Sequence, residues 1–320
     1  MEDVASPWLP GGHLQTIWPA LAARRVQGGP VRYRRERWTT PDGDFVDVDR
    51  LHAQPGAALL VLFHGLEGSS GSHYAQAFAG YARSQGLAYA VPHFRGCSGE
   101  INRAPRAYHS GDHVEVGWML SQLRAGHDGP LLAVGVSLGG NALMRWAGEA
   151  GTSATRLADA VAAISAPLDL AASGHAIGRG FNRQVYTRMF LRSMKPRALS
   201  KWAQYPGLFD AVALKAARDL YTFDNLFTAP LHGFRNTDHY WREASALPHL
   251  ARIALPALLL NARNDPFVPA DSLPTPAQCS RYVRLWQPER GGHVGFARGP
   301  WPGHVMALPE AVGHWLRQPH

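Results

Sequence analysis

The sequence is poor in cysteine, and its two cysteines are not spaced for a structural role. Cys97 and Cys279 lie far apart in the 320 residues, and no C-x-x-C pair is present. This pattern excludes a disulfide scaffold and a zinc ribbon. The strings G-x-G-x-x-G and G-K-[ST], which are typical of phosphate-binding loops, are also missing. We therefore expect a protein that works without a nucleotide or any other cofactor.

Long hydrophobic runs are missing as well. The densest apolar segments, Ala57–Phe63 and Ala257–Leu260, have the length of strands, whereas a membrane-spanning helix needs about 20 apolar residues. The first residues are acidic where a secretory signal peptide is basic, and prolines interrupt their apolar stretch. We expect a soluble, cytoplasmic protein without a transmembrane segment, whose contact with a membrane surface would be transient.

Lysine is scarce although the chain is basic. The sequence has 32 basic and 24 acidic residues, and three of the basic ones are lysines. A basic face can bind nucleic acid, but the arginines are scattered apart from Arg32, Arg34, Arg35 and Arg37, which share a strand-like segment. No nucleic-acid-binding motif accompanies them. We expect a solvated surface and no nucleic-acid partner; the sequence does not indicate an oligomeric state.

Hydrophobic periodicity predicts an α/β fold. Two strand-like runs, Val31–Thr39 and Phe45–His52, flank the turn residues of a hairpin. After them, apolar runs alternate with segments of helical length, which predicts a mostly parallel, twisted sheet flanked by helices on both faces. The predicted strands are Ala58–His64, Leu87–His93, Leu131–Val136 and Ala160–Ala166, and the predicted helices are Ser72–Gln85, Asp112–Arg124 and Leu138–Glu149.

A long insertion interrupts this alternation. The strand pattern stops at Pro167 and resumes at Pro256, with two further strands and a last helix. A structureless loop of this length is uncommon, so we expect residues 168–255 to form a helical cap within a single domain of residues 1–320. These later elements are Ala257–Asn261, Tyr282–Trp286 and Gly303–Leu316, and the helical stretches of the insertion are Asn182–Met194 and Lys201–Leu220.

The strongest chemical signal is a serine between a strand and a helix. Gly135-Val136-Ser137-Leu138-Gly139 directly follows a predicted strand and opens a predicted helix. This is the context of a nucleophile elbow, in which small neighbours permit a strained turn that exposes the serine hydroxyl. The helix N-terminus also favours negative charge developing beside the serine.

A serine nucleophile needs a base and a carboxylate that orients it. Asp265 follows the strand Ala257–Asn261, and His293 lies in a glycine-rich loop after the strand Tyr282–Trp286, so both come from loops after later strands in the order serine, acid, histidine. Asp169 is an alternative acid. His304 and His314 are less suitable bases because they lie on the last helix or its approach.

Two backbone N–H groups are candidates for an oxyanion hole. One belongs to Leu138, the residue after the serine, and the other to Leu66, in the loop after the strand Ala58–His64, with Gly65 as an alternative. His64 is interpreted as a brace for this loop. The string His109-Ser-Gly-Asp-His113 lacks further ligands at a recognisable spacing, so we expect no metal there. We expect Ser110 or Asp112 to cap the next helix instead.

Eight short segments match the motifs of one enzyme family. They are Leu9–Trp18, His64–Ser70, Pro92–Glu100, Arg106–Asp112, Gly135–Asn141, Ala229–Phe234, Asn261–Phe267 and Gly291–Phe296. With these segments the chain resembles the YheT-like branch of the α/β-hydrolases, which is related to fungal ethyl-ester synthase/esterases and to animal α/β-hydrolase-domain lipases. The resemblance implies the α/β-hydrolase fold, and its triad falls on Ser137, Asp265 and His293.

The resemblance also implies a function. It implies a serine carboxylesterase that hydrolyses short- to medium-chain acyl esters, so its partner is a small-molecule ester. One alternative is an acyltransferase that uses an alcohol acceptor with the same triad. Some relatives carry an H-x-x-x-x-D acyltransferase motif that this sequence lacks, which favours hydrolysis. Another alternative is a non-catalytic, hydrolase-like binding protein. We also expect apolar side chains of Phe181–Phe190 and Tyr221–Phe227 to line an acyl pocket.

Overall fold

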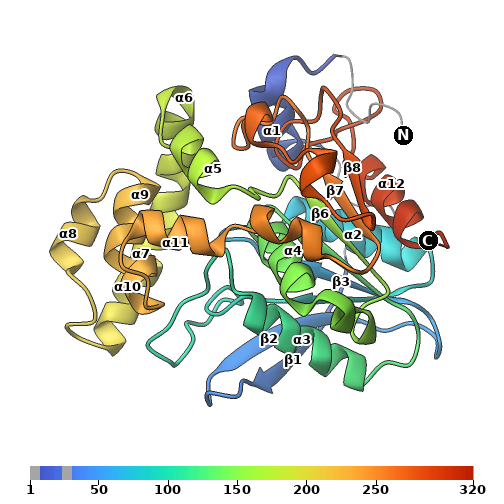
Figure 1. Ribbon diagram of the computed structural model, residues 1–320, viewed down its shortest axis with the longest axis horizontal. Coiled ribbons are helices and arrows are strands. Elements are labelled where there is room, and N and C mark those ends of the chain that lie inside the picture. The colour runs from blue at the N-terminus through green and yellow to red at the C-terminus, as the bar shows by residue number, and fades with distance from the viewer. Residues whose placement is uncertain (1–7, 24–30, 320) are drawn as a thin grey trace.

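A mixed sheet of eight strands forms the centre of the molecule in the computed structural model, which describes residues 8–23 and 31–319 (Figure 1). Its strand order is β1-β2-β4-β3-β5-β6-β7-β8. Strands β3 to β8 run parallel to one another, whereas β2 pairs antiparallel with both of its neighbours, β1 and β4. The mostly parallel sheet predicted from the sequence is confirmed. The strands are Arg34–Thr39, Phe45–Leu51, Leu59–Phe63, Ala88–Pro92, Leu131–Val136, Ala160–Ile164, Ala257–Leu260 and Val283–Trp286, numbered β1 to β8.

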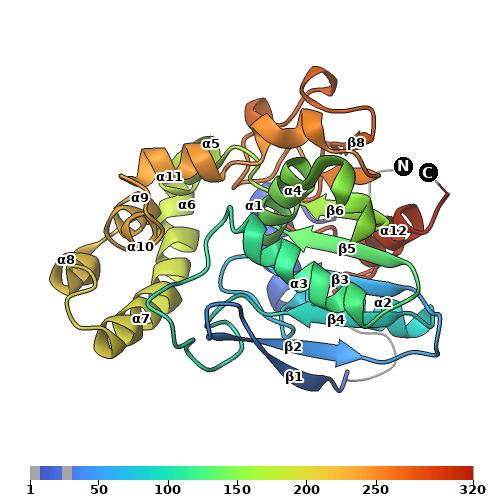
Figure 2. The ribbon, with the colours of Figure 1, turned by 60° about the horizontal axis from the view of Figure 1, so that its bottom comes forward.

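Helices cover both faces of the sheet. Leu59, Val61 and Phe63 of β3 pack in one core with helices α3 (His113–Ala125) and α4 (Leu138–Ala150). Leu60 and Leu62 of the same strand pack in a second core with α2 (His73–Ser84) and α12 (Ala307–Leu316). Figure 2 shows α3 and α4 on the near side of the sheet. Burial on both faces explains why the central strands are continuously apolar.

The arginine cluster near the N-terminus belongs to the edge of this sheet. In β1, Arg35 donates two hydrogen bonds to Asp49 of β2, at 2.7 and 2.8 Å, and Arg37 donates two to Asp47, at 2.8 and 3.0 Å. These arginines lie directly opposite their partners in the antiparallel pair. Two of the four clustered arginines are thus held by carboxylates of the neighbouring strand.

The long insertion between β6 and β7 is helical. It lies to one side of the sheet, and the arrow of β5 points toward it (Figures 1 and 2). Its α-helices are α5 (Leu170–Ile177), α6 (Gly180–Asn182), α7 (Arg188–Gln204), α8 (Ala211–Ala216), α9 (Leu220–Phe223), α10 (Ala229–Leu231) and α11 (Thr237–Ala244). Short π-helical turns at Arg183–Thr187 and Asp224–Thr228 join neighbouring helices, and a 3-10 turn at Leu247–Arg252 leads back to the sheet.

One helix boundary in the insertion differs from the prediction. The sequence predicts a continuous helical stretch over Lys201–Leu220, but α7 ends at Gln204 and α8 begins at Ala211. Between them lies Pro206, followed by Gly207 with a φ of +86°. Proline cannot donate the hydrogen bond that a helix interior needs, and a positive φ ends the right-handed spiral.

The N-terminal segment contains a helix that its proline and glycine content concealed. Helix α1 spans Gly11–Leu21 and includes Pro19. The first predicted strand, Val31–Thr39, is shorter in the structure, where β1 begins at Arg34. The remaining 3-10 turns are Gly151–Arg156, Ala270–Ser272 and Pro276–Gln278. No helix in the described part of the chain is both long and apolar enough to cross a bilayer.

Candidate active site

Ser137 occupies a strained turn between β5 and α4. Its backbone has φ +53° and ψ −119°, a region that residues other than glycine rarely adopt and that costs about 1–3 kcal/mol. The N–H of Ser137 donates to the Ile164 carbonyl of β6 at 2.8 Å. This bond to the neighbouring strand, and the helix that begins at the next residue, hold the turn. The predicted strand–turn–helix context of the serine is therefore present.

The glycines on either side of Ser137 are required by close packing. A Cβ atom on Gly135 would lie 2.4 Å from the carbonyl oxygen of Gly139, and one on Gly139 would lie 2.4 Å from the carbonyl oxygen of Phe63. Both distances are shorter than real Cβ contacts, and the obstructing atoms are backbone. The G-x-S-x-G pattern is thus explained by the approach of α4 to strands β3 and β5.

The structure brings the three predicted residues into one chain of hydrogen bonds. His293 Nδ1 lies 2.8 Å from Asp265 Oδ2, and His293 Nε2 lies 3.0 Å from Ser137 Oγ. The other carboxylate oxygen of Asp265 accepts the Phe267 N–H at 2.8 Å. Because a carboxylate can only accept, the imidazole proton lies on Nδ1, which leaves Nε2 free to accept from the serine hydroxyl.

Helix α1 holds the loops that carry Asp265 and His293, a role that the sequence alone did not reveal. Thr16 Oγ1 accepts the His293 N–H at 2.9 Å, and Gln15 Oε1 accepts from the Gly291 N–H at 2.8 Å and from Asn264 Nδ2 at 2.9 Å. The only sequence signal for this contact was the family segment Leu9–Trp18, which had no assigned role.

The alternative acid and bases have other partners. The Asp169 carboxylate accepts the Ala172 N–H at 3.0 Å and caps α5. His304 accepts from the Met306 N–H at 3.3 Å, and His314 contacts Gln318 at 2.9 Å. None of these three side chains is hydrogen-bonded to Ser137 or His293.

The loop after β3 presents an unpaired N–H beside the serine. A Cβ atom on Gly65 would lie 3.2 Å from Ser137 Cβ, so this loop passes directly against the elbow. The N–H groups of Gly65 and Glu67 donate to the hydroxyls of Tyr74 and Tyr108, at 2.8 and 2.9 Å. Between them, the N–H of Leu66 has no hydrogen-bond partner among residues 8–23 and 31–319. Leu138 opens α4, where N–H groups also lack helical partners.

His64 braces this loop from within the core. Its Nδ1 lies 2.8 Å from the Gly65 carbonyl, and its Nε2 accepts the Phe94 N–H at 3.1 Å. Burial lowers the pKa of His64 to about 3, so the ring is neutral at physiological pH. It can therefore accept and donate at once, as these two contacts require.

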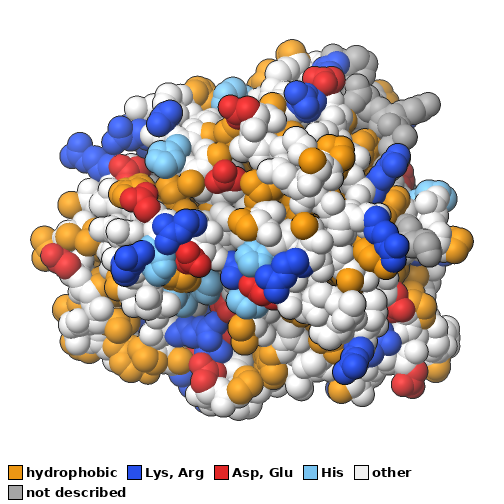
Figure 3. Space-filling view, viewed as in Figure 1, with side chains coloured by type: hydrophobic (Ala, Val, Ile, Leu, Met, Phe, Trp, Pro, Cys, Tyr) orange, Lys and Arg blue, Asp and Glu red, His pale blue; other side chains and the backbone are white. Residues whose placement is uncertain are grey.

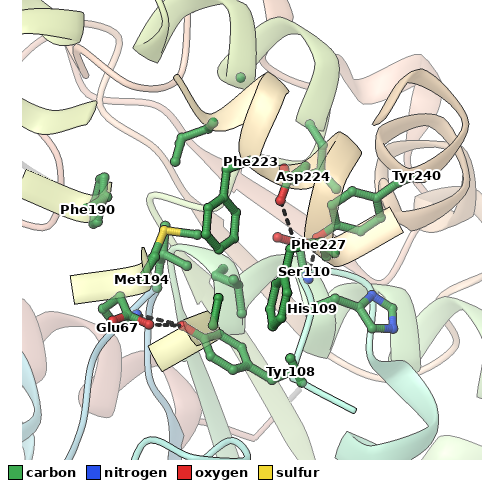
Figure 4. Close-up of a pocket in the computed structure, with 18 of the residues that line it drawn as sticks. Glu67, Tyr108, His109, Ser110, Phe190, Met194, Phe223, Asp224, Phe227 and Tyr240 are labelled. Carbon is green, nitrogen blue, oxygen red and sulfur yellow. Dashed lines mark hydrogen bonds between the residues drawn. The ribbon is translucent and has the colours of Figure 1, made fainter. Parts of the chain in front are cut away.

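A pocket between the sheet and the insertion has Ser137 in its lining. Figure 4 shows part of this lining. Its apolar lining includes Phe190, Phe223 and Phe227, as the sequence predicts, together with Met194 of α7. Other predicted aromatics do not line it: Phe181 and Tyr221 are 52% and 39% exposed. The sequence predicted the two segments but not which of their residues face the pocket, because packing decides this: the Phe181 ring contacts His13 and Tyr186 instead.

The pocket wall also carries an enclosed carboxyl group. Asp224 Oδ1 accepts from Thr228 Oγ1 at 2.6 Å, and its Oδ2 accepts from the indole N–H of Trp241 at 2.9 Å. Desolvation outweighs these two hydrogen bonds and raises the pKa of Asp224 to about 6.

The histidine-containing string at residues 109–113 does not form a metal site. Asp112 instead accepts two hydrogen bonds from Arg106, at 2.7 and 2.8 Å, and precedes α3 without a side-chain capping bond. Desolvation lowers the pKa of His109 to about 3. Within residues 8–23 and 31–319, no group of three or more His, Cys, Asp or Glu side chains is arranged to hold a metal ion.

This fold and site are those of a hydrolase family. The model of the alpha/beta hydrolase fold family matches residues 58–300, and the chain belongs to this family. It is 41% identical over 312 residues to "Putative esterase YheT" of Escherichia coli strain K12, covering 95% of this chain and 89% of the relative. It is 27% identical over 283 residues to mouse phospholipase ABHD3, covering 85% of this chain and 68% of the relative.

Further relatives and solved structures agree. The chain is 27% identical to a yeast monoacylglycerol lipase (Saccharomyces cerevisiae), covering 82% of this chain and 59% of the relative. The fold is similar to that of the Pyrococcus furiosus esterase Pf2001, with a TM-score of 0.56, 16% identity and coverage of 92% and 96% of the two chains. The implied YheT-like resemblance and the α/β-hydrolase fold are confirmed, and the chain is a hydrolase of the esterase and lipase type.

The raised pKa of Asp224 predicts a pH-dependent stability. The folded protein holds this proton more tightly than the unfolded chain, whose aspartates titrate near 4. The wild type therefore loses stability as the pH rises from about 4 to about 6, and keeps the lower value above that range. Asp224→Asn removes this loss while its amide can still hydrogen-bond Thr228 and Trp241.

The measurement is the thermal midpoint of unfolding from pH 4 to 8, with the exposed Asp271→Asn as control. We expect the thermal midpoint of Asp224→Asn, relative to that of the wild type, to increase as the pH rises from 4 to 6. The midpoint of the control should change with pH as that of the wild type does. A constant difference between Asp224→Asn and the wild type across this range would contradict the prediction.

Proposed function

We propose that the protein is a serine carboxylesterase that hydrolyses short- to medium-chain acyl esters through an acyl-enzyme intermediate. The observation that supports it is the hydrogen-bonded chain of Ser137, His293 and Asp265, whose serine lines a largely apolar pocket. The relatives named esterase, monoacylglycerol lipase and phospholipase act on esters, which agrees with this proposal.

In the first half-reaction, Ser137 Oγ attacks the ester carbonyl while His293 Nε2 takes the hydroxyl proton. Asp265 keeps the proton of His293 on Nδ1 and stabilises the imidazolium that forms. The tetrahedral intermediate then collapses: the bond from carbon to the alcohol oxygen breaks, and His293 gives its proton to the leaving alcohol. The acyl group remains as an ester on Ser137.

In the second half-reaction, water takes the place of the alcohol. His293 accepts a proton from the water as its oxygen attacks the acyl-enzyme carbonyl. When this intermediate collapses, the bond from carbon to Ser137 Oγ breaks, His293 gives its proton to Oγ, and the carboxylic acid is released. In both halves the N–H groups of Leu66 and Leu138 donate to the oxyanion. Their lack of other partners supports this role, because a pre-oriented donor needs no rearrangement when charge develops.

Two competing functions remain, and they differ from hydrolysis in the acyl acceptor or in the absence of any reaction. An acyltransferase would use an alcohol in place of water, with the same residues. A binding protein with the hydrolase fold would not turn over at all. The first alternative is distinguished by product analysis and the second by any turnover that depends on Ser137.

The experiment is hydrolysis of p-nitrophenyl esters from acetate to laurate, with and without added ethanol. We expect turnover that is abolished by Ser137→Ala in a folded variant, with the free acid as main product in ethanol-free buffer and in ethanol. Formation of the ethyl ester as main product would establish the acyltransferase instead. Turnover that survives Ser137→Ala would exclude the proposed nucleophile.

Neutralising one aspartate separates the two candidate acids. Asp265→Asn should lower kcat by up to about 10⁴, the effect of losing an orienting carboxylate, because the asparagine amide favours the wrong histidine tautomer. Asp169→Asn retains an N-cap acceptor for α5 and should leave kcat within about twofold of the wild type. Steady-state kinetics on p-nitrophenyl butyrate measure both. A larger loss in Asp169→Asn would move the acid to the loop after β6.

Tyr108 is proposed to position the oxyanion loop. Its hydroxyl accepts the Glu67 N–H at 2.9 Å and donates to Glu67 Oε1 at 2.9 Å, next to Leu66 (Figure 4). Tyr108→Phe removes both bonds, so we expect kcat to fall by about 10–100-fold with KM within twofold, less than the loss of a whole oxyanion donor.

Tyr240→Phe is the matched control for this variant. Tyr240 is a buried tyrosine of the same pocket whose hydroxyl accepts a loop N–H, that of Ser110, at 2.9 Å. This loop carries no proposed oxyanion donor, so Tyr240→Phe should keep kcat within about threefold. Equal losses in both variants would mean that Tyr108 only contributes to packing.

The insertion of residues 168–255 is proposed to act as a cap that selects the acyl chain. Each methylene of substrate buried against Phe190, Phe223 or Phe227 contributes about 0.8 kcal/mol. Alanine at each of these positions should shift the preferred acyl length by one or two carbons and largely spare acetyl esters. Phe181→Ala, outside the pocket, should keep the wild-type profile of kcat/KM against chain length. If the pocket variants lower kcat/KM equally at every chain length and keep the wild-type optimum, the cap does not select the acyl chain.

A further inference from the structure

One face of the insertion gathers cationic side chains without acidic partners. A shallow depression over α7 is lined by Arg183, Gln184, Arg188, Leu191, Arg192, Lys195, Ala217 and Arg218. No salt bridge joins any of these five cations to an acidic side chain in the part of the chain that the structure describes. The nearest acidic residue in sequence, Asp219, accepts the Thr222 N–H at 2.8 Å and caps α9. We call this depression the cationic face.

The two sides of α7 have different surroundings. Arg188, Arg192 and Lys195 recur at the spacing of one helix face and line the cationic face. Phe190, Met194 and Ala198, which recur at every fourth residue on the other side of the helix, line the pocket that also contains Ser137. The same helix thus separates an acyl pocket from an uncompensated positive surface.

Exposed apolar side chains accompany the cations. Phe181 of α6 and Met189 of α7 are 52% and 54% exposed and lie close in sequence to these cations, and the Phe181 ring also packs against His13 and Tyr186. Figure 3 shows Lys and Arg side chains at the upper left of the molecule, where Figure 1 shows α6 and α9, with hydrophobic side chains and a few acidic and histidine side chains among them. Like charges held together repel each other unless an anion neutralises them, so this arrangement favours a binding role.

We propose that the cationic face docks the protein on membranes that contain anionic phospholipids. Basic side chains attract such a surface, and apolar side chains beside them can enter the headgroup region. Exposed Met189 favours a lipid surface over a nucleic acid, because the phosphate backbone offers no apolar partner to an aliphatic side chain, whereas an aromatic ring such as that of Phe181 can contact either. This surface is independent of the proposed catalysis, since binding can be measured without turnover.

The experiment is sedimentation of the full-length protein with vesicles of phosphatidylcholine alone or with 30% phosphatidylglycerol. We expect binding to the anionic vesicles that weakens steeply between 50 and 300 mM NaCl. Each basic residue near such a surface contributes about fivefold in partitioning, so Arg188→Gln/Arg192→Gln should weaken binding about 25-fold. Phe181→Ser should weaken it further at high salt, where the apolar contact dominates.

The matched control removes the same charge elsewhere. Arg156 and Arg284 are exposed on the body of the protein, and Arg156→Gln/Arg284→Gln lowers the net charge by the same two units. This control should bind within about twofold of the wild type. Unchanged thermal midpoints establish that both double variants are folded, whether or not the protein hydrolyses esters.

Three results would overturn the proposal. Equal weakening by the two double variants would show that net charge, and not this face, attracts the vesicles. Equal binding to neutral and anionic vesicles would show that the cations are not used. Binding to a labelled single-stranded RNA 20-mer, lost in Arg188→Gln/Arg192→Gln, without binding to anionic vesicles would assign the face to nucleic acid.

Discussion

The structure depends on one constrained position, the backbone turn at Ser137. The turn holds a non-glycine residue at a positive φ, which is tolerated only because neighbouring elements determine it from several sides. The Ser137 N–H bonds to β6, α4 begins at the next residue, and the two motif glycines let α4 approach β3 and β5 without a clash. The strained turn projects the Ser137 hydroxyl toward the imidazole of His293, the proposed base.

The rest of the site is built around that fixed hydroxyl by segments far apart in sequence. Asp265 and His293 come from loops after β7 and β8, and α1, more than 240 residues earlier in the chain, bonds both loops through Gln15 and Thr16. Such bonds fix the loops more tightly than their own turns could, so the imidazole keeps its place between carboxylate and serine. The insertion then covers this edge of the sheet and encloses an apolar pocket.

The sequence was sufficient for the parts of the structure that local rules determine. Strands buried on both faces read as apolar runs, and the serine, acid and histidine could be placed by their order after strands. Helix α1 was not predicted, because Pro19 and the glycines obscure its periodicity, and its value lies in contacts with distant loops. The lining of the pocket was predicted as two segments but not residue by residue, because packing against distant elements decides which side chains face it: Phe190 lines the pocket, whereas Phe181 packs against His13 of α1 and Tyr186.

The central claim is that Ser137 is the nucleophile activated by His293, and covalent labelling tests it most directly. The folded protein would be treated with a fluorophosphonate probe, digested and mapped by mass spectrometry, alongside the His293→Ala variant. We expect a single phosphonylated residue, Ser137, with labelling slowed at least 100-fold in His293→Ala. Labelling at another residue, or equal labelling rates in the wild type and His293→Ala, would contradict it.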